Sequence, residues 1–389
     1  MKLVANEDLD WLRDPENRVY FYLYTAYLEA RKGGKRKTFD EHKFEVNEFE
    51  NLLLLMKAIM FKEYRTLRVT AHVIFNPVLR EIFAAAFRDR VVHHFIYMII
   101  YDWWDRHFIY DSYSCREGKG TELGIKRLQH HIRSVSATGK QVYVVKMDIQ
   151  GFFMSLDRRK LYKQALWWLD LQFEGHKGLT SHIVKFCLCQ VVMDDPVKGV
   201  RRKGWPENWK KMPDTKSLFK QLPGIGIVIG NLTSQLLSNI FLDMLDRYIK
   251  FVLGYKHYGR YVDDFYIVVT KEELPKVLAD VENIRRFLRR IGLRLHPKKF
   301  SVQPAKNGVP FLGAVVYANV IHPGKRLKAN ARKAFYKYAH GAHNEVSLVS
   351  YVGYLKHMKH YKCLCEICES VGLPREYWKN FEKLGEVEC

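Results

Sequence analysis

Helical periodicity dominates this chain, and it is interrupted by short runs of β-branched and aromatic residues that fit strands. Helices are predicted over residues 9–30, 45–64, 91–104, 121–134, 158–171, 231–251, 271–291, 325–340 and 346–361. Strands are predicted over 142–145, 293–302 and 309–317, and residues 75–90 are predicted to begin extended. Residues 194–222, rich in Pro, Gly, Trp and Lys, are typical of a long surface loop. This mixture predicts an α+β protein.

Two adjacent carboxylates, Asp263 and Asp264, lie within residues 255–270 (YKHYGRYVDDFYIVVT). The flanking residues predict a strand, a tight turn and a second strand, with both acids at the tip. Neighbouring carboxylates repel one another, so a positive group is expected beside them, and a divalent metal ion is the first candidate. Taken alone, the YVDD tetrapeptide fits an acidic surface turn equally well.

A further carboxylate, Asp148, ends an apolar run within residues 141–157 (QVYVVKMDIQGFFMSLD). The run is too short for a helix and predicts a buried strand. If this strand pairs with the hairpin, three carboxylates form a cage for two Mg²⁺ ions. Nucleotidyl transfer uses such a cage, because one ion lowers the pKa of the primer 3′-hydroxyl and the other neutralises the triphosphate.

These motifs resemble those of reverse transcriptases, in which Asp148 matches the motif A aspartate and YVDD matches motif C. The resemblance is closest to the reverse transcriptases of diversity-generating retroelements. Further matching blocks follow in order along the chain, at residues 76–94 (NPVLREIFAAAFRDRVVHH), 112–121 (SYSCREGKGT), 226–242 (GIVIGNLTSQLLSNIFL), 295–300 (LHPKKF) and 309–313 (VPFLG). The resemblance implies a right-hand polymerase with fingers, an antiparallel palm sheet and a helical thumb. We expect residues 1–322 to form fingers and palm, and residues 323–389 to form the thumb.

The resemblance also implies roles for individual residues. Asp148, Asp263 and Asp264 would be catalytic metal ligands. Phe153, five residues after Asp148, would exclude the 2′-hydroxyl of a ribonucleotide, although Phe152 could be confused with it. Contacts to the incoming deoxynucleotide are implied for Arg80, Phe153, Ile229, Gly230, Gln235 and Lys299. Contacts to template or primer are implied for Arg116, Lys119, Phe311, Leu312 and Gly313.

Ile229 departs from the pattern of group II intron enzymes, which carry Gln at this position before the glycine. An aliphatic side chain can neither donate nor accept a hydrogen bond, so selection between correct and incorrect base pairs should weaken. The resembled family makes cDNA with errors at template adenines. We therefore expect Ile229 to contribute to adenine mutagenesis, with Gln235 shaping the same pocket; a plain packing residue is the alternative.

Charge agrees with a nucleic-acid partner, since 64 Lys and Arg against 42 Asp and Glu give a formal net charge of +22 over 389 residues. The seven Cys residues and the polar start of the chain predict reduced thiols in a cytoplasm-like compartment, without a membrane anchor. The cluster Cys363, Cys365 and Cys368 could bind zinc but more simply supplies buried thiols. The resemblance implies a bacterial or phage origin, a template-repeat RNA, and a small basic helical accessory protein that forms a pentamer.

Three other interpretations stay open at this stage. A group II intron enzyme is disfavoured by Ile229 and by Gln235 after Ser234. A retron-type enzyme is disfavoured because no Val-Thr-Gly follows the seventh block. An RNA-binding protein with an inactive polymerase fold is disfavoured by the intact acid set, which is unfavourable to keep without metal.

Overall fold

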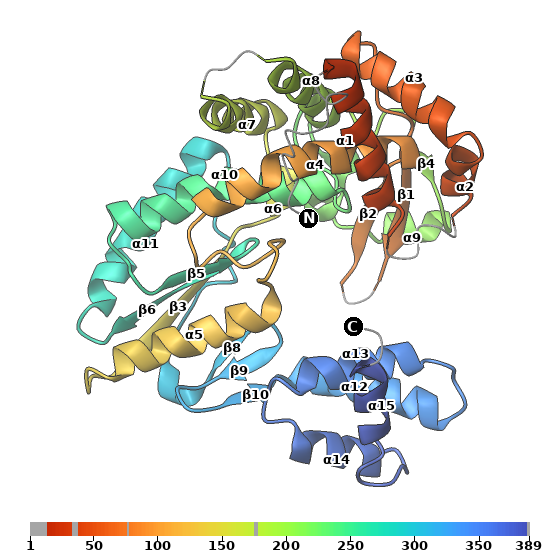
Figure 1. Ribbon diagram of the computed structural model, residues 1–389. Helices are drawn as coiled ribbons and strands as arrows, with labels where there is room; N and C mark the ends of the chain where they lie inside the picture. The colour runs from red at the N-terminus through yellow and green to blue at the C-terminus, as the bar shows by residue number, and fades with distance from the viewer. Residues whose placement is uncertain (1–13, 33–37, 76–77, 175–177, 387–389) are drawn as a thin grey trace. The chain divides into compact units, whose positions relative to one another are not determined.

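A computed structural model describes residues 14–32, 38–75, 78–174 and 178–386. The chain forms two compact units, each assembled from separate segments (Figure 1). Unit 1 comprises residues 1–109, 149–247 and 286–295, and unit 2 comprises residues 110–148, 248–285 and 296–389. The chain therefore passes from one unit to the other several times.

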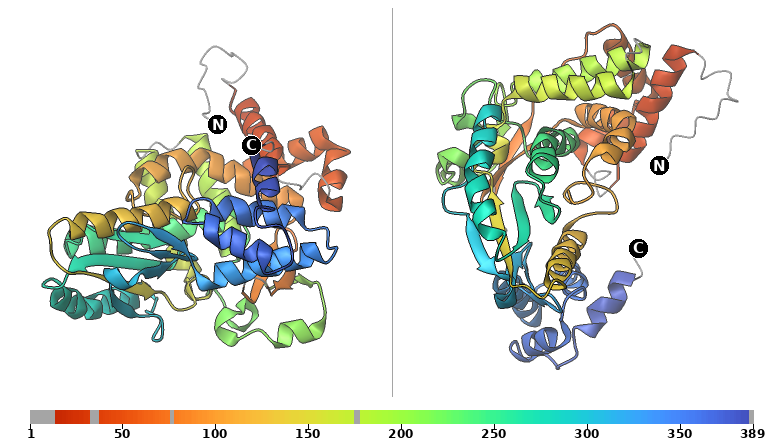
Figure 2. Two further views of the ribbon diagram at one scale, coloured as in Figure 1. Left: turned by 90° about the horizontal axis from the view of Figure 1, so that it is seen from below. Right: turned by 90° about the vertical axis from the view of Figure 1, so that its left-hand side faces the viewer.

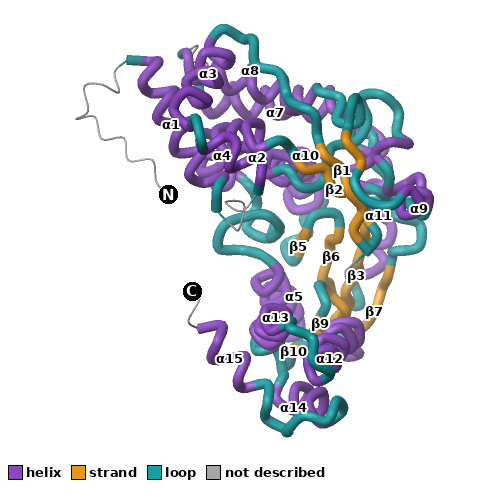
Figure 3. The backbone as a smooth tube through the Cα atoms, turned by 90° about the vertical axis from the view of Figure 1, so that its right-hand side faces the viewer, coloured by secondary structure: helices purple, strands orange, loops and turns teal. Residues whose placement is uncertain are grey.

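The principal sheet belongs to unit 2 and is antiparallel, with the strand order β5-β6-β3-β7. Its strands are β5 (Tyr258–Tyr261), β6 (Asp264–Thr270), β3 (Val142–Asp148) and β7 (Ser301–Pro304). In β6 every residue from Phe265 to Thr270 is buried, because elements cover both faces of the sheet. Helix α5 (Thr121–Ser136) packs on one face, and α11 (Leu274–Ile291) lies on the other (Figures 2 and 3). β3 and β6 are therefore packed within unit 2 along most of their length.

A small second sheet in unit 2 extends the same core. Strands β8 (Val309–Phe311), β9 (Ala314–Val316) and β10 (Ile321–Pro323) pair antiparallel in the order β10-β9-β8. Phe311 is buried beside Tyr266 of the principal sheet, with ring centroids 5.2 Å apart at 84°. The apolar side of α5 closes this core, which fixes the β8–β9 turn relative to the principal sheet.

Helices α12 (Lys325–Ala339), α13 (Glu345–Leu355), α14 (Tyr361–Glu369) and α15 (Lys379–Glu386) end the described chain. They enclose a core of their own that includes Phe335, Leu348 and Trp378. Cys363, Cys365 and Cys368 are free thiols buried in this core. Among the described residues these thiols form no metal-ligand cluster, and Cys389 lies outside that range. Their position fits the packing interpretation.

Unit 1 joins a helical layer to a three-stranded sheet of order β2-β1-β4. The strands are β1 (Thr70–Ile74), β2 (Arg80–Ala84) and β4 (Arg201–Arg202). The helices of this unit are α1 (Pro15–Ala30), α2 (Phe39–Glu45), α3 (Glu48–Met60), α4 (Phe87–His107), α6 (Phe152–Ser155), α7 (Arg158–Gln172), α8 (Leu179–Met193), α9 (Pro206–Lys210) and α10 (Leu232–Arg247). Helix α4 packs against α1 and α10, and α7 packs against α8. The Asp157 carboxylate caps α7 by accepting from the Arg159 amide at 2.8 Å.

Several sequence-based boundaries need correction. The helix predicted over 45–64 is α3, which is shorter at both ends, and the separate helix α2 before it was not predicted. The first residues of the helix predicted over 9–30 lie outside the described range. The strand predicted over 293–302 is wrong for most of its length, because a turn at residues 297–298 precedes β7, which begins only at Ser301 and ends at Pro304. The loop predicted over 194–222 contains β4 and α9. Among the described residues no helix has the length and apolar character needed to cross a bilayer.

Candidate active site

Three aspartates meet at one end of the principal sheet. Asp148 is the last residue of β3 and lies directly opposite Asp264, the first residue of β6. Tyr261 pairs with Asp264 across the hairpin, so Val262 and Asp263 form its two-residue turn. Asp148 is buried, with 8% exposure. The strand and hairpin predicted from the sequence therefore place these carboxylates together within unit 2.

The hairpin turn carries an unusual backbone conformation. Val262 has φ = 55°, in the left-handed region that glycine and asparagine normally occupy in such turns. For a β-branched residue this conformation is a genuine outlier, and it stores on the order of 1–3 kcal/mol of strain. Strain of this kind persists only where neighbouring groups hold the backbone in place. The turn therefore needs support from the rest of unit 2.

Electrostatic repulsion among the carboxylates is only partly offset by lysines. Burial and the neighbouring Asp148 raise the pKa of Asp263 to about 6. Burial also raises the pKa of Asp264, against the opposing effect of Lys146, whose Nζ lies 3.7 Å from an Asp264 carboxylate oxygen. Lys299 Nζ donates to Asp148 Oδ2 at 2.8 Å. The other oxygen of that carboxylate, Oδ1, is buried and accepts no hydrogen bond from any of the described residues.

These features fit a site for hard divalent cations. The donors are carboxylate oxygens, which Mg²⁺ and similar ions prefer, and the buried Asp148 Oδ1 has no hydrogen-bond donor within the described part of the chain. Among the described residues, the one trio with ligand atoms all within 4.8 Å is Glu41, His42 and Glu45, where Arg31 already pairs with both glutamates. The ligand atoms of Asp148, Asp263 and Asp264 are not all within 4.8 Å of one another.

A turn near the principal sheet carries the predicted primer contacts Phe311, Leu312 and Gly313. Leu312 and Gly313 have φ of 47° and 82°, so the chain reverses sharply between β8 and β9. The Tyr354 hydroxyl donates to the Leu312 main-chain oxygen at 2.6 Å. Lys146 Nζ donates to the Pro310 main-chain oxygen at 2.8 Å, so one lysine contacts both this segment and Asp264. Lys146 was not among the residues predicted from the sequence, although a charged residue within an apolar strand is a recognisable signal.

The two predicted template contacts, Arg116 and Lys119, differ in burial, since Arg116 is buried and Lys119 is half-buried. Arg116 is buried, and its guanidinium donates to the Ser112 main-chain oxygen at 3.0 Å. Lys119 Nζ lies 4.2 Å from the centroid of the Tyr110 ring. Both side chains hold the loop before α5 in shape. Their contact with template stays a prediction.

The predicted nucleotide contacts in unit 1 gather around one small core. Phe153 and Ile229 are both half-buried against a cluster that contains Ala71, Phe83 and Val228. The Ile227 amide donates to the Phe153 oxygen at 2.9 Å, and the Phe83 amide donates to the Ile229 oxygen at 3.2 Å. Main-chain bonds on both sides therefore fix the segment that carries Ile229.

Other predicted nucleotide contacts flank this core. Gly230 has φ = 121°, and a Cβ there would lie 3.1 Å from the Phe83 oxygen, so a side chain would strain the turn. Arg80 is the first residue of β2 and is exposed, and Gln235 is exposed on α10. Phe152, in contrast to Phe153, is 2% exposed and serves as a core residue. This difference favours Phe153 as the residue available to a ligand.

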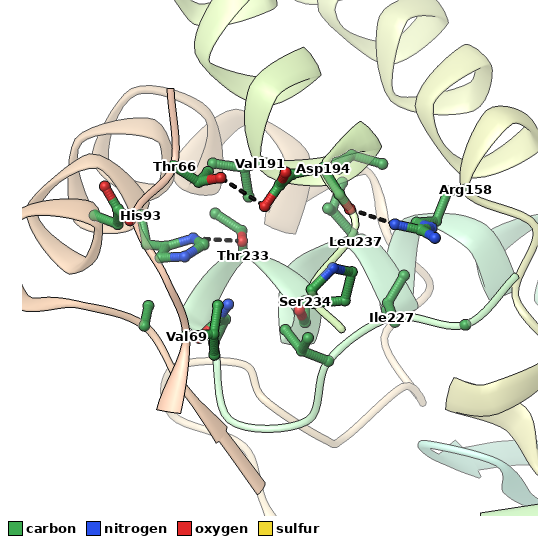
Figure 4. Close-up of a pocket in the computed structure, with 17 residues that line it drawn as sticks. Thr66, Val69, His93, Arg158, Val191, Asp194, Ile227, Thr233, Ser234 and Leu237 are labelled. Atoms are coloured by element: carbon green, nitrogen blue, oxygen red, sulfur yellow. Dashed lines mark hydrogen bonds between the residues drawn. The ribbon is translucent and has the colours of Figure 1, made fainter. Parts of the chain in front are cut away.

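A cavity of about 50 Å³ in unit 1 is lined in part by Ile227 and Val228 (Figure 4). Helices α4, α8 and α10 contribute to its walls. His93 Nδ1 lies 2.8 Å from Thr233 Oγ1, and the Thr66 hydroxyl donates to an Asp194 carboxylate oxygen at 2.5 Å. The His93 ring is fully enclosed, and burial lowers its pKa to about 3.

Acid should destabilise the protein through His93. The folded state keeps this ring neutral down to about pH 3, whereas the unfolded chain protonates it below about pH 6.5. Stability therefore falls as the pH drops through this window. Between pH 7 and pH 5 the parent should lose about 2 kcal/mol more of its unfolding free energy than His93→Gln. Urea denaturation at both pH values measures the difference.

The control for this comparison is the exposed His182 on α8. His182→Gln should keep the full acid sensitivity of the parent. An equal loss of stability in the parent and in His93→Gln would show that His93 does not hold its neutral form in the folded state.

Comparison with known families gives one match. The family described as "Reverse transcriptase (RNA-dependent DNA polymerase)" matches residues 79–316, more than half of the chain. The matched range contains β3, the β5–β6 hairpin and the three aspartates. A search of curated proteins found no match.

Proposed function

The chain belongs to the reverse transcriptase family, and we propose that it makes error-prone cDNA from a template-repeat RNA in a diversity-generating retroelement. Membership of this family makes it an RNA-directed DNA polymerase that uses template RNA, a DNA strand, deoxynucleotides and divalent metal ions. We further propose that the errors occur opposite template adenines and diversify a target gene. This proposal rests on the residues around Ile229.

We assign Asp148, Asp263 and Asp264 as ligands of two Mg²⁺ ions. The bound ions would activate the primer 3′-hydroxyl and stabilise the charge on the triphosphate. Within unit 2, Lys299 and Lys146 hold two of the carboxylates in place, at 2.8 Å from Asp148 and 3.7 Å from Asp264. The protein thus contributes placement and electrostatic stabilisation, and no covalent intermediate with a side chain is required.

Ile229 is the observation that carries the mutagenic part of the proposal. Its main-chain oxygen accepts from the Phe83 amide, and its side chain packs against the same apolar cluster as Phe153, which we assign as the residue that excludes ribonucleotides. A purely apolar side chain at this place offers no hydrogen bond to the base pair. Selection between bases then depends on shape alone, which discriminates weakly between similar partners. We propose that Gln235 shapes the same pocket and that misincorporation concentrates opposite template adenines.

Primer extension on an RNA template with Mg²⁺ and deoxynucleotides, followed by sequencing of the product, tests this proposal. Substitutions concentrated opposite adenines support it. Faithful cDNA would instead support an intron-type or retron-type enzyme. No cDNA, even with the native RNA and a candidate accessory protein present, would favour an RNA-binding protein without polymerase activity.

Replacing Ile229 with glutamine should improve fidelity. The new side chain can form hydrogen bonds where the parent has none, so errors opposite template adenines should fall by about 10-fold. Errors opposite the other template bases serve as the internal reference. Ile229→Val, which keeps the apolar character, is the matched control and should keep the parental error pattern. An unchanged adenine error rate in Ile229→Gln would remove Ile229 from the mechanism.

The partners of the proposed system follow from the same assignment. We propose that a bacterial or phage template-repeat RNA is the substrate, and that a small basic helical protein assembling as a pentamer assists the enzyme. The formal net charge of +22 favours the RNA partner. The affinity of the purified enzyme for RNA should fall steeply as the salt concentration rises, because each phosphate that the protein neutralises releases a counterion. A titration of binding at several salt concentrations measures this dependence.

A further inference from the structure

The strained backbone at Val262 requires support from neighbouring groups. Val262 has φ = 55°, and the next residue is Asp263. A relaxation of Val262 towards the ordinary β region would swing the following peptide and redirect that carboxylate. Some neighbouring group must therefore favour the left-handed conformation over the relaxed one.

Arg260 is placed to provide this support. Its side chain lies in β5 and is 1% exposed, which is rare for arginine. Its Nη1 donates to the Val262 main-chain oxygen at 3.0 Å, and its Nη2 donates to Ser112 Oγ at 3.1 Å. A charged donor forms a stronger hydrogen bond than a neutral one, especially away from water. The guanidinium therefore reaches across the turn and fixes the peptide that precedes Asp263.

The arginine is itself held from the opposite side. Its amide donates to the Asp111 main-chain oxygen at 2.9 Å, and its main-chain oxygen accepts from the Tyr113 amide at 3.0 Å. The Asp111 carboxylate in turn accepts from Arg127 Nε of α5 at 2.7 Å and from the Tyr113 hydroxyl at 3.0 Å. The support of the turn thus extends through residues 111–113 to helix α5.

We infer that Arg260 is a positioning residue, which holds Val262 in the left-handed conformation so that Asp263 faces the metal site. The inference rests on the assignment of the aspartates as metal ligands. The buried Arg260 guanidinium would then fix the backbone of the turn and would not serve only to balance the negative charge of the aspartates. This support also explains how a β-branched residue is tolerated where glycine would be expected.

A double-mutant cycle between Arg260 and Val262 tests the inference. Arg260→Gln should lower kcat by about 10²-fold with little change in the KM for deoxynucleotide, because a misplaced catalytic group impairs the chemical step. Val262→Gly supplies the second background, because glycine adopts positive φ without strain. In that background the same Arg260 change should lower kcat by only about 3-fold relative to Val262→Gly alone.

Metal binding gives a readout that does not depend on turnover. Mn²⁺ titration followed by electron paramagnetic resonance should show weaker binding to Arg260→Gln than to the parent. The Val262→Gly background should restore most of that loss. Binding of the RNA template to each variant reports separately on whether the rest of the protein remains folded.

The outcomes separate positioning from simple stability. An equal loss in both backgrounds would overturn the inference, because it would mean that Arg260 acts without Val262. Unchanged kcat and Mn²⁺ affinity in Arg260→Gln would also overturn it. If Arg260→Gln fails to fold, Ser112→Ala provides the second variant, since it removes the 3.1 Å bond that orients the guanidinium and leaves the arginine in place. That variant should show a smaller kcat loss, again relieved by Val262→Gly, and no such relief would contradict the inference.

Discussion

Replacing Asp263 with alanine is expected to abolish DNA synthesis while leaving RNA binding intact. The carboxylate lies at the tip of the β5–β6 turn beside Asp148 and Asp264, where we assign it to the metal ions. Loss of a metal ligand removes several kcal/mol of transition-state stabilisation, so the rate should fall by at least ~10³-fold. Primer extension with saturating deoxynucleotides measures the rate, and a mobility-shift titration measures RNA affinity.

Two comparisons make this result specific. Asp170→Ala removes an exposed carboxylate of α7 that pairs with Lys185, and it should retain parental activity.

Asp263→Ala should also have a higher unfolding free energy than the parent in EDTA at pH 8, because the raised pKa of Asp263 means that its ionised carboxylate is disfavoured in the folded state. The gain should vanish near pH 4, where the carboxyl group is protonated. Retained synthesis in Asp263→Ala would remove this residue from the catalytic set.

Replacing Phe153 with alanine is expected to let the enzyme accept ribonucleotides. The Phe153 side chain is only half-buried against the cluster that Ile229 also packs against, and we propose that its exposed part faces a bound sugar. Removing it opens space for a 2′-hydroxyl, and the preference for deoxynucleotides should fall by about 10²-fold. The ratio of kcat/KM for dATP and ATP on one primer and template measures this preference.

Phe152 provides the matched control, since it is the adjacent residue and its ring centroid lies 5.2 Å from that of Phe153. Phe152 is 2% exposed, so alanine there should lower the unfolding free energy by about 3–5 kcal/mol and leave sugar preference unchanged in the folded fraction. A loss of sugar preference in Phe152→Ala alone would show that the two roles are reversed.

Local pattern was sufficient to predict the elements that carry the aspartates. The apolar run before Asp148 becomes β3, and the two runs around YVDD become β5 and β6 with the acids at the turn. In β6 every residue from Phe265 to Thr270 is buried and all but the last are apolar, so the acidic end of this strand is easily recognised in the sequence. Helix α5 was equally clear because its apolar positions recur with helical spacing.

Other features depend on contacts that periodicity does not encode. Strand β4 is only two residues long and exists because Arg201 and Arg202 pair with β1, in a segment rich in loop-forming residues. Helix α8 was missed because its sequence, LTSHIVKFCLCQVVM, is apolar on most sides and rich in β-branched residues. The role inferred for Arg260 required the backbone angle of Val262, which no sequence pattern reports.

The interleaving of the two units has a consequence for how the chain can fold during synthesis. Unit 1 is complete only when residues 286–295 have been made, although most of it lies before residue 248. The principal sheet of unit 2 waits still longer, because β3 receives its second neighbour, β7, at residues 301–304. Pairings between such distant segments form slowly and leave strand edges exposed until they close. A ribosome-bound chain that ends near residue 250 should therefore depend on chaperones. Because each unit consists of three separate segments, a single continuous fragment of the chain cannot contain one complete unit alone, and such a fragment should be insoluble when expressed.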